Sequence, residues 1–175
     1  GAGDDIGSSY VEVNLTAQHL FVYKDGKKVV DTAVTTGKPV NHHQTNVGIF
    51  RVKSHEANRT LRGRNDDGSS YASPVKYWMP FDGGIGLHDA PWKSNYGGKN
   101  YLANGSHGCV NLPPSVAGNV FANVSVGMPV IVYNLPGTET SCTDSAVQAV
   151  INKISKAGSG PAAAKAATDA YQALS

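Results

Sequence analysis

Two kinds of side chain in this sequence could act together as a nucleophile and its base. Cys109 follows a glycine in the run from Ser106 to Asn111, which reads SHGCVN, and His107 lies two positions before it. Another histidine, His88, lies further upstream in the run IGLHDAPW. A thiolate is the reactive form of cysteine, and a histidine within hydrogen-bond reach can accept the thiol proton. Positions i and i+2 of an extended segment share a face, so the residues alone leave both histidines as candidate bases.

The immediate neighbours of the cysteine have chemical uses of their own. Gly108 has no Cβ, so a substrate can come close to the backbone there. The N–H groups of His107, Gly108 and Cys109 could converge on a developing oxyanion. Ser106 and Asn111 bracket the nucleophile, and either hydrogen bonding to substrate or local turn capping would explain them.

Aromatic side chains near these residues could line a substrate cleft. The candidates are Tyr77, Trp92 and Tyr101, for which ordinary packing is the alternative, and Trp92 is favoured because it lies close to His88. The other histidines are expected to be structural or exposed rather than metal ligands; they are His19, His42, His43 and His55.

Composition narrows the class of protein. The chain has 175 residues, 40% of them hydrophobic, and a formal net charge of +2, which suits one domain with a real core. The basic residues are scattered, so no nucleic-acid partner is predicted. No apolar run approaches the ~20 residues that span a bilayer. A disulfide between Cys109 and Cys142 is not excluded, but Cys142 lies in a polar run and a free Cys109 thiol is favoured.

Alternating apolar and polar residues predict a mainly β domain that positions these groups. Asp25-Gly26 predicts a tight hairpin turn between two of its strands. Pro113-Pro114 predicts the start of one embedded helix at residues 115–124. The polar residues 56–70 predict an exposed loop or irregular hairpin tip, and residues 94–104 a loop over the site. The expected strands are residues 10–15, 19–24, 28–34, 47–52, 75–79, 85–88 and 130–133.

Three segments are expected along the chain. Residues 1–8 would be a linker or cloning remnant, and residues 9–135 the folded domain. Residues 138–175 carry apolar positions at helical spacing, interrupted by GSGP, which predicts a short helical hairpin as a C-terminal appendage.

Several motifs together resemble a known family. The pattern S-H-G-C-h-N with an upstream histidine is similar to that of the L,D-transpeptidase catalytic domain, or YkuD family, of Gram-positive type. The run NLTAQHLFVYKDGK at residues 14–27 and Thr36-Gly37-Lys38 match its N-terminal half. Residues 45–50 depart from it, because they lack the usual proline before the glycine. The resemblance covers about residues 10–133 and implies a β-sandwich or barrel-like YkuD-type fold.

The resemblance also implies roles and partners. Cys109 would be the nucleophile, His88 the base oriented by the backbone carbonyl of Asp89, and His107 a supporting residue. The donor would be a peptidoglycan tetrapeptide stem that loses D-Ala, and a second stem's amine would accept the acyl group, giving a 3→3 cross-link. Water as acceptor would make the protein an L,D-carboxypeptidase. Carbapenem β-lactams would be inhibitors, and no cofactor or metal is expected. The location would be extracellular, at the cell wall, with a membrane anchor or further domains outside this chain.

Three other functions remain alternatives. Cysteine and histidine are zinc ligands, so His88, Asp89, His107 and Cys109 could form a metal site. However, the sequence has no H-E-x-x-H or paired C-x-x-C motif, and zinc would leave Gly108 unexplained. Papain-like peptidases place the cysteine before the histidine, and sortases use a longer spacing and another motif. A catalytically silent wall-binding module is the third alternative.

Overall fold

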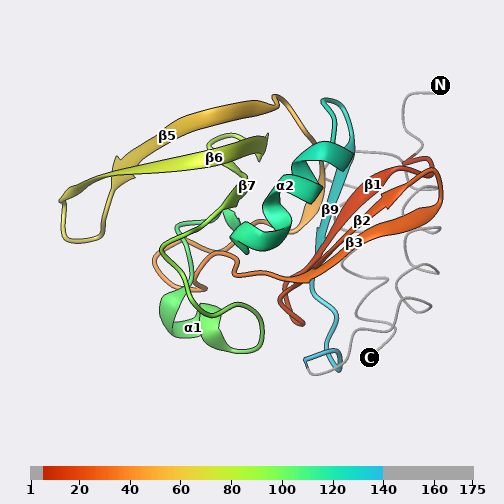
Figure 1. Ribbon diagram of the computed structural model, residues 1–175. Helices are drawn as coiled ribbons and strands as arrows, with labels where there is room; N and C mark the ends of the chain where they lie inside the picture. The colour runs from red at the N-terminus through yellow and green to blue at the C-terminus, as the bar shows by residue number, and fades with distance from the viewer. Residues whose placement is uncertain (1–5, 140–175) are drawn as a thin grey trace.

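Two β-sheets form the framework of the computed structural model, which describes residues 6–139 (Figure 1). The first sheet has the strand order β3-β2-β1-β9-β4 and the second β5-β6-β7-β8. The strands of the first are β1 (Tyr10–Asn14), β2 (His19–Lys24), β3 (Lys27–Ala33), β4 (Gly48–Arg51) and β9 (Pro129–Tyr133). Those of the second are β5 (Glu56–Arg64), β6 (Ser70–Asp82), β7 (Ile85–Asp89) and β8 (Val110–Leu112). The prediction of a mainly β domain is confirmed.

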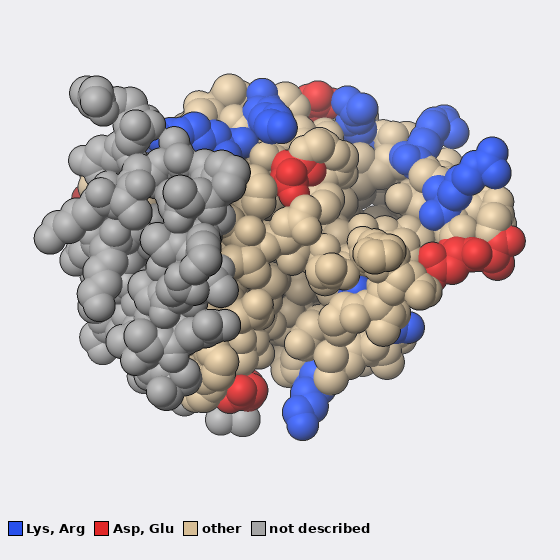
Figure 2. Space-filling model, turned by 180° about the vertical axis from the view of Figure 1, so that it is seen from behind, with Lys and Arg blue, Asp and Glu red and all other residues tan. Residues whose placement is uncertain are grey.

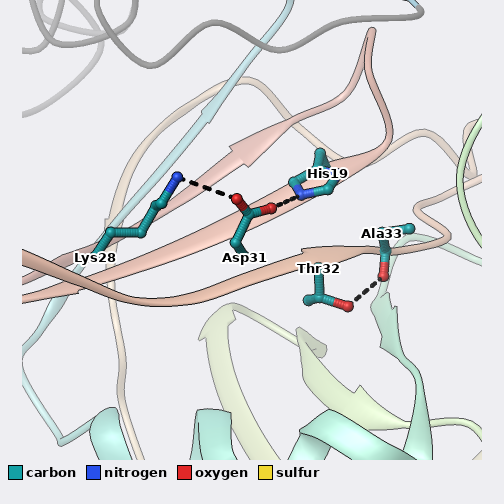
Figure 3. Close-up of polar contacts among 5 residues, drawn as sticks. All are labelled: His19, Lys28, Asp31, Thr32 and Ala33. Atoms are coloured by element: carbon teal, nitrogen blue, oxygen red, sulfur yellow. Dashed lines mark hydrogen bonds and ion pairs between the residues drawn. The ribbon is translucent and has the colours of Figure 1, made fainter.

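The β2–β3 hairpin forms as its turn residues predict. Asp25 and Gly26 both have positive φ, 52° and 78°, which is the backbone conformation of a two-residue type I′ turn. On the outer face of this hairpin Asp31 accepts a hydrogen bond from His19 and lies 3.1 Å from the Lys28 ammonium (Figure 3). Partial burial opposes ionisation of Asp31, but the bonds from His19 and Lys28 outweigh it and lower its pKa. His19 is therefore a structural residue of the hairpin.

One helix packs between the two sheets. Helix α2 (Pro114–Asn123) begins with a proline in its first turn, where the missing N–H costs nothing, and lies between the sheets in Figure 1. It buries Ala117 and Val120 completely, against β2, β3, β6 and β7. The main core cluster between the sheets also contains Val13, Met79 and other apolar residues that no solvent reaches.

The strand order of the second sheet places the motif that contains His88 beside the motif that contains Cys109. Strands β7 and β8 pair in parallel, with His88 opposite Asn111 and Leu87 opposite Val110. Leu87 and Val110 are fully buried in the core. Because side chains alternate along a strand, His88 and Asn111 lie on the other face, together with Cys109, two positions before Asn111.

Several expectations need correction. The polar run expected as a loop contains the nine-residue strand β5, and the β5–β6 hairpin extends away from the rest of the domain (Figure 1). The expected loop at residues 94–104 ends in a short helix, α1 (Asn100–Asn104), and β8 was not predicted. The predicted C-terminal helical hairpin and Cys142 lie outside the described residues. Within residues 6–139 no helix is long and apolar enough to cross a membrane.

Candidate active site

Cys109 and His88 line one cleft of about 510 Å³. They come from neighbouring strand segments: His88 is in β7, and Cys109 immediately precedes β8 on the same face of the sheet. Gly84, Trp92 and Asn111 border the same space. The sheet register thus brings the nucleophile and base candidates together although they are distant in the sequence.

Residues 106–109, which carry Cys109, form the nucleophile loop. The segment Thr35 to Lys38 holds it from the side opposite β7. Thr35 and Asn111 exchange backbone hydrogen bonds of 3.1 and 2.8 Å, and Lys38 N–H donates to the Ser106 carbonyl at 2.9 Å. Gly37 has no room for a side chain, because a Cβ there would lie 1.9 Å from the carbonyl oxygen of His43. The Thr-Gly-Lys motif therefore has a structural purpose, which is to bring backbone close to the cysteine loop.

The loop is also held by two hydroxyl groups, one of its own and one from the segment before β4. Ser106 Oγ donates to the Cys109 carbonyl and accepts the N–H of Gly108 at 3.1 Å. Thr45 Oγ1 donates to the Gly108 carbonyl at 2.6 Å. The N–H of Gly108, one of three expected oxyanion donors, is thus already used inside the loop. Ser106 borders the cleft, but the contacts it makes here are those of a loop brace.

The Cys109 thiol is protonated in the resting site. Its sulfur lies 3.7 Å from the Gly84 carbonyl oxygen, to which it can hydrogen-bond only as an S–H donor. Burial raises the pKa of Cys109 to about 11, against a smaller lowering by the N–H of Gly86. The side chain is half-buried and still reaches the cleft. A thiol in this state needs a base before it can act as a nucleophile.

His88 has the geometry of such a base. Its Nδ1 lies 2.7 Å from the Asp89 carbonyl oxygen, which can only accept, so Nδ1 carries the proton and Nε2 is free to take one. This is the carbonyl to which the resemblance pointed. Burial lowers the pKa of His88, so the ring is neutral near pH 7. Trp78 and Trp92 flank the ring, with centroids 5.9 and 5.8 Å away.

Asp89 contributes its backbone to the site, and its carboxylate serves elsewhere. Oδ1 accepts the N–H groups of Lys76 and Tyr77 at 2.9 and 3.0 Å. The Asp89 carboxylate is therefore bonded to strand β6 and does not join the other three candidate zinc ligands. Among residues 6–139 no group of three or more His, Cys, Asp or Glu side chains is arranged to hold a metal.

Asn111 lines the cleft and has an unused acceptor. Its side chain is 1% exposed, and its Oδ1 has no hydrogen-bond partner within residues 6–139. Leaving a buried polar atom unpaired costs about 1–3 kcal/mol. A donor on a bound ligand would remove that cost.

His107 is turned toward residues that the sequence did not single out. Its ring stacks on His43 with centroids 4.3 Å apart and planes 14° apart, and Tyr71 approaches it edge-on at 5.6 Å. His43 was expected on the surface, and the polar loop around it gave no signal of this contact. There was also little indication in the sequence that Tyr71 lies at this site, since the β5–β6 hairpin exposes both faces and its sequence is typical of a loop.

Two predicted cleft aromatics lie elsewhere. Tyr77 packs on Phe121 of α2, with centroids 4.8 Å apart, and borders a separate cavity. Tyr101 lies in α1 and does not border the cleft. Trp92 does border it and is 52% exposed. Trp78, opposite His88 on β6, is a cleft aromatic that the sequence reading missed.

The cleft walls carry positive charge. Arg59, Arg62 and Lys93 line it, and no Asp or Glu of the described residues does. Lys93 donates to the Asn104 carbonyl at 2.6 Å, and Arg59 pairs with Glu56 at 2.7 Å. Figure 2 shows basic side chains along the β5–β6 hairpin and acidic ones at its tip, where the turn holds Asp66 and Asp67.

Comparison with known proteins shows the family to which this chain belongs. The family model for the L,D-transpeptidase catalytic domain, YkuD, matches residues 8–132. L,D-transpeptidase 1 of Mycobacterium tuberculosis is 31% identical over 135 residues, which are 73% of this chain and 52% of that protein. The chain thus spans about half the length of the curated relatives it matches.

Solved structures agree. A cysteine-to-serine mutant of the Enterococcus faecium L,D-transpeptidase is 45% identical with a TM-score of 0.68, over 71% of this chain and 49% of that one. The NMR structure of the E. faecium catalytic domain acylated by ertapenem is 47% identical with a TM-score of 0.65, over 72% and 97%. On the family match and these identities, the chain belongs to the L,D-transpeptidase catalytic domain family, YkuD.

Proposed function

We propose that the chain is a cysteine-dependent L,D-transpeptidase acting on peptidoglycan stem peptides. The observation that carries this proposal is the joint position of Cys109 and His88 in one cleft, with Nδ1 of His88 committed to a backbone carbonyl and Nε2 free. A protonated thiol beside a neutral imidazole is an arrangement for general-base activation during attack. Asn111 supports the proposal as an acceptor for an N–H of the stem peptide.

The reaction has two half-steps. Sγ of Cys109 attacks the carbonyl of the L-centre before D-Ala while His88 takes the thiol proton, and a thioester forms. The C–N bond breaks, and His88 returns the proton to the departing D-Ala amine. The side-chain amine of a second stem then attacks the thioester, the C–S bond breaks, and a 3→3 cross-link remains. Water in place of the amine gives an L,D-carboxypeptidase, the second candidate function.

Carbapenem β-lactams are proposed as inhibitors that acylate Cys109. The support is the E. faecium catalytic domain acylated by ertapenem, to which this chain is 47% identical. Because the proposed substrate is the cell wall, the proposed location is extracellular, at the wall, with a membrane anchor or further domains outside this chain.

Mass spectrometry of products tests the function. The protein is incubated with purified disaccharide-tetrapeptide, and Cys109→Ala is the control. A dimer lighter than two substrates by one D-Ala is expected for transpeptidation, whereas shortened monomer alone would indicate the carboxypeptidase. Unchanged substrate together with no acyl group on Cys109 would overturn the proposal in favour of a wall-binding module.

A further inference from the structure

His107 is held in place by an arrangement that spans two separate parts of the chain. The ring stacks face to face on His43, from the loop between β3 and β4, and meets the edge of Tyr71, from strand β6. His107 is itself exposed at the cleft. An exposed ring on a loop would otherwise sample several rotamers, so these two contacts restrict it.

His43 is in turn fixed by the tip of the β5–β6 hairpin. Its Nε2 lies 2.7 Å from Oδ1 of Asp66, and the other carboxylate oxygen accepts the Asn41 amide at 3.0 Å. The hydrogen bond from His43 is the main cause of a lowered pKa for Asp66, with that from Asn41 next, so the carboxylate is ionised at neutral pH. The chain of contacts therefore runs Asp66 to His43 to His107.

This arrangement leaves His107 with an available lone pair. Partial burial lowers its pKa and the neighbouring His43 lowers it further, although the Asp66 carboxylate acts in the opposite direction. A neutral imidazole has one ring nitrogen that can accept a proton. His107 lines the cleft on the same loop as Cys109, where an acyl group would be carried.

We propose that Asp66 and His43 are positioning residues that hold His107 beside the thioester, where it accepts a proton from the incoming acceptor amine. This inference rests on the proposed function. In the step concerned the amine nitrogen bonds to the thioester carbon, its proton passes to His107, and the C–S bond breaks with its electron pair on Sγ. The thiolate of Cys109 then regains a proton from His107, and both groups return to their resting state.

The turn offers a matched control for a test. Asp67 is adjacent and carries the same charge, but it accepts bonds from Ser69 and has no hydrogen bond or ion pair with either histidine within residues 6–139. Asp66→Asn and Asp67→Asn are compared in two steps: acylation of Cys109 by the tetrapeptide donor, and transfer from the isolated acyl-enzyme to an acceptor amine. Asp66→Asn is expected to slow transfer about tenfold and to leave acylation unchanged, because misplacement of a reacting group costs that much or more. Asp67→Asn is expected to change neither step.

A double-mutant cycle separates positioning from a general structural effect. His107→Gln is expected to slow transfer by about two orders of magnitude, the scale of a lost general base. In that background Asp66→Asn should have no further effect, because it acts only through His107. Equal transfer rates for the two Asp variants, or a tenfold loss that persists without His107, would overturn the inference.

One readout does not depend on activity. NMR cross-relaxation between the ring protons of His43 and His107 is expected in the wild type and in Asp67→Asn, and should be lost in Asp66→Asn. Retention of the signal in Asp66→Asn would overturn the inference even if the protein is inactive. Absence of an acyl-enzyme in the wild type would instead count against the proposed function, so the two failures can be told apart.

Discussion

At the scale of single residues, Cys109 and His88 are both neutral in the resting site. Burial shifts the pKa of the thiol upward, to about 11, and that of the imidazole downward. A thiolate–imidazolium ion pair is therefore not the resting state, and proton transfer accompanies attack. This differs from cysteine sites in which a nearby positive charge holds the thiolate ready before the substrate arrives.

The neutral pair predicts how the rate of alkylation of Cys109 by iodoacetamide depends on pH. Only the thiolate reacts, and an acid with a raised pKa stays protonated until the pH approaches that value, so the rate should rise about tenfold per pH unit from pH 7 to 10. Peptide-resolved mass spectrometry distinguishes Cys109 from Cys142. His88→Ala should leave this curve nearly unchanged, yet slow acylation by substrate by about two to four orders of magnitude. A labelling rate that levels off by pH 8 would contradict the neutral pair.

The sequence predicted the candidate nucleophile and base of the cleft better than the residues that surround them. Cys109, His88 and Trp92 belong to distinctive local motifs, and all three border the cleft. His43 and Tyr71 reach the site only through tertiary contacts between a polar loop and a hairpin. No local pattern encodes such contacts, because both segments are largely solvated and carry no apolar periodicity.

At the scale of elements, strands with a run of buried apolar residues were predictable, and the exposed or very short ones were not. β2 was predicted over His19–Lys24 as observed, and its four central residues are all apolar and buried. β5 is exposed along most of its length and pairs only with β6, so its polar sequence reads as a loop. β8 has three residues, too few to show a period. Its place is fixed by β7 on one side and residues 35–37 on the other.

The support that residues 35–37 give to β8 can be tested by a substitution at Gly37. A Cβ at Gly37 would lie 1.9 Å from a backbone oxygen and 2.9 Å from the Cα of Gly108, so backbone must move. Gly37→Ala should destabilise the fold by about 1–3 kcal/mol, the usual range for overpacking, and displace the nucleophile loop. Urea denaturation measures the first effect and the rate of carbapenem acylation the second.

Gly84→Ala is the matched control for stability, since a Cβ there meets open space. An unfolding midpoint for Gly37→Ala equal to that of this control would show that the segment can shift freely. It would also mean that residues 35–37 do not brace the nucleophile loop.

At the scale of the whole molecule, charge is placed unevenly although the net charge is only +2. The cleft walls carry Arg59, Arg62 and Lys93, while the acidic pair Asp66 and Asp67 lies at the hairpin tip (Figure 2). A cleft with one sign of charge concentrates ligands of the opposite sign. The proposed donor carries a free carboxylate on D-Ala, next to the bond that is cut. The cleft therefore suits an anionic donor.

Arg62 is the best place to test this. Glu56 pairs with Arg59 and the Asn104 carbonyl accepts a hydrogen bond from Lys93, whereas the Arg62 side chain has no ion pair or hydrogen bond within residues 6–139. Arg62→Gln should lower kcat/KM for acylation by the tetrapeptide about three- to tenfold at low salt, because a rim charge mainly affects association. The difference should shrink at 0.5 M NaCl, where screening acts within a few ångströms. Arg64→Gln removes the same charge from the same hairpin without touching the cleft. If it lowers kcat/KM as much as Arg62→Gln does, the effect belongs to overall charge rather than to the cleft wall.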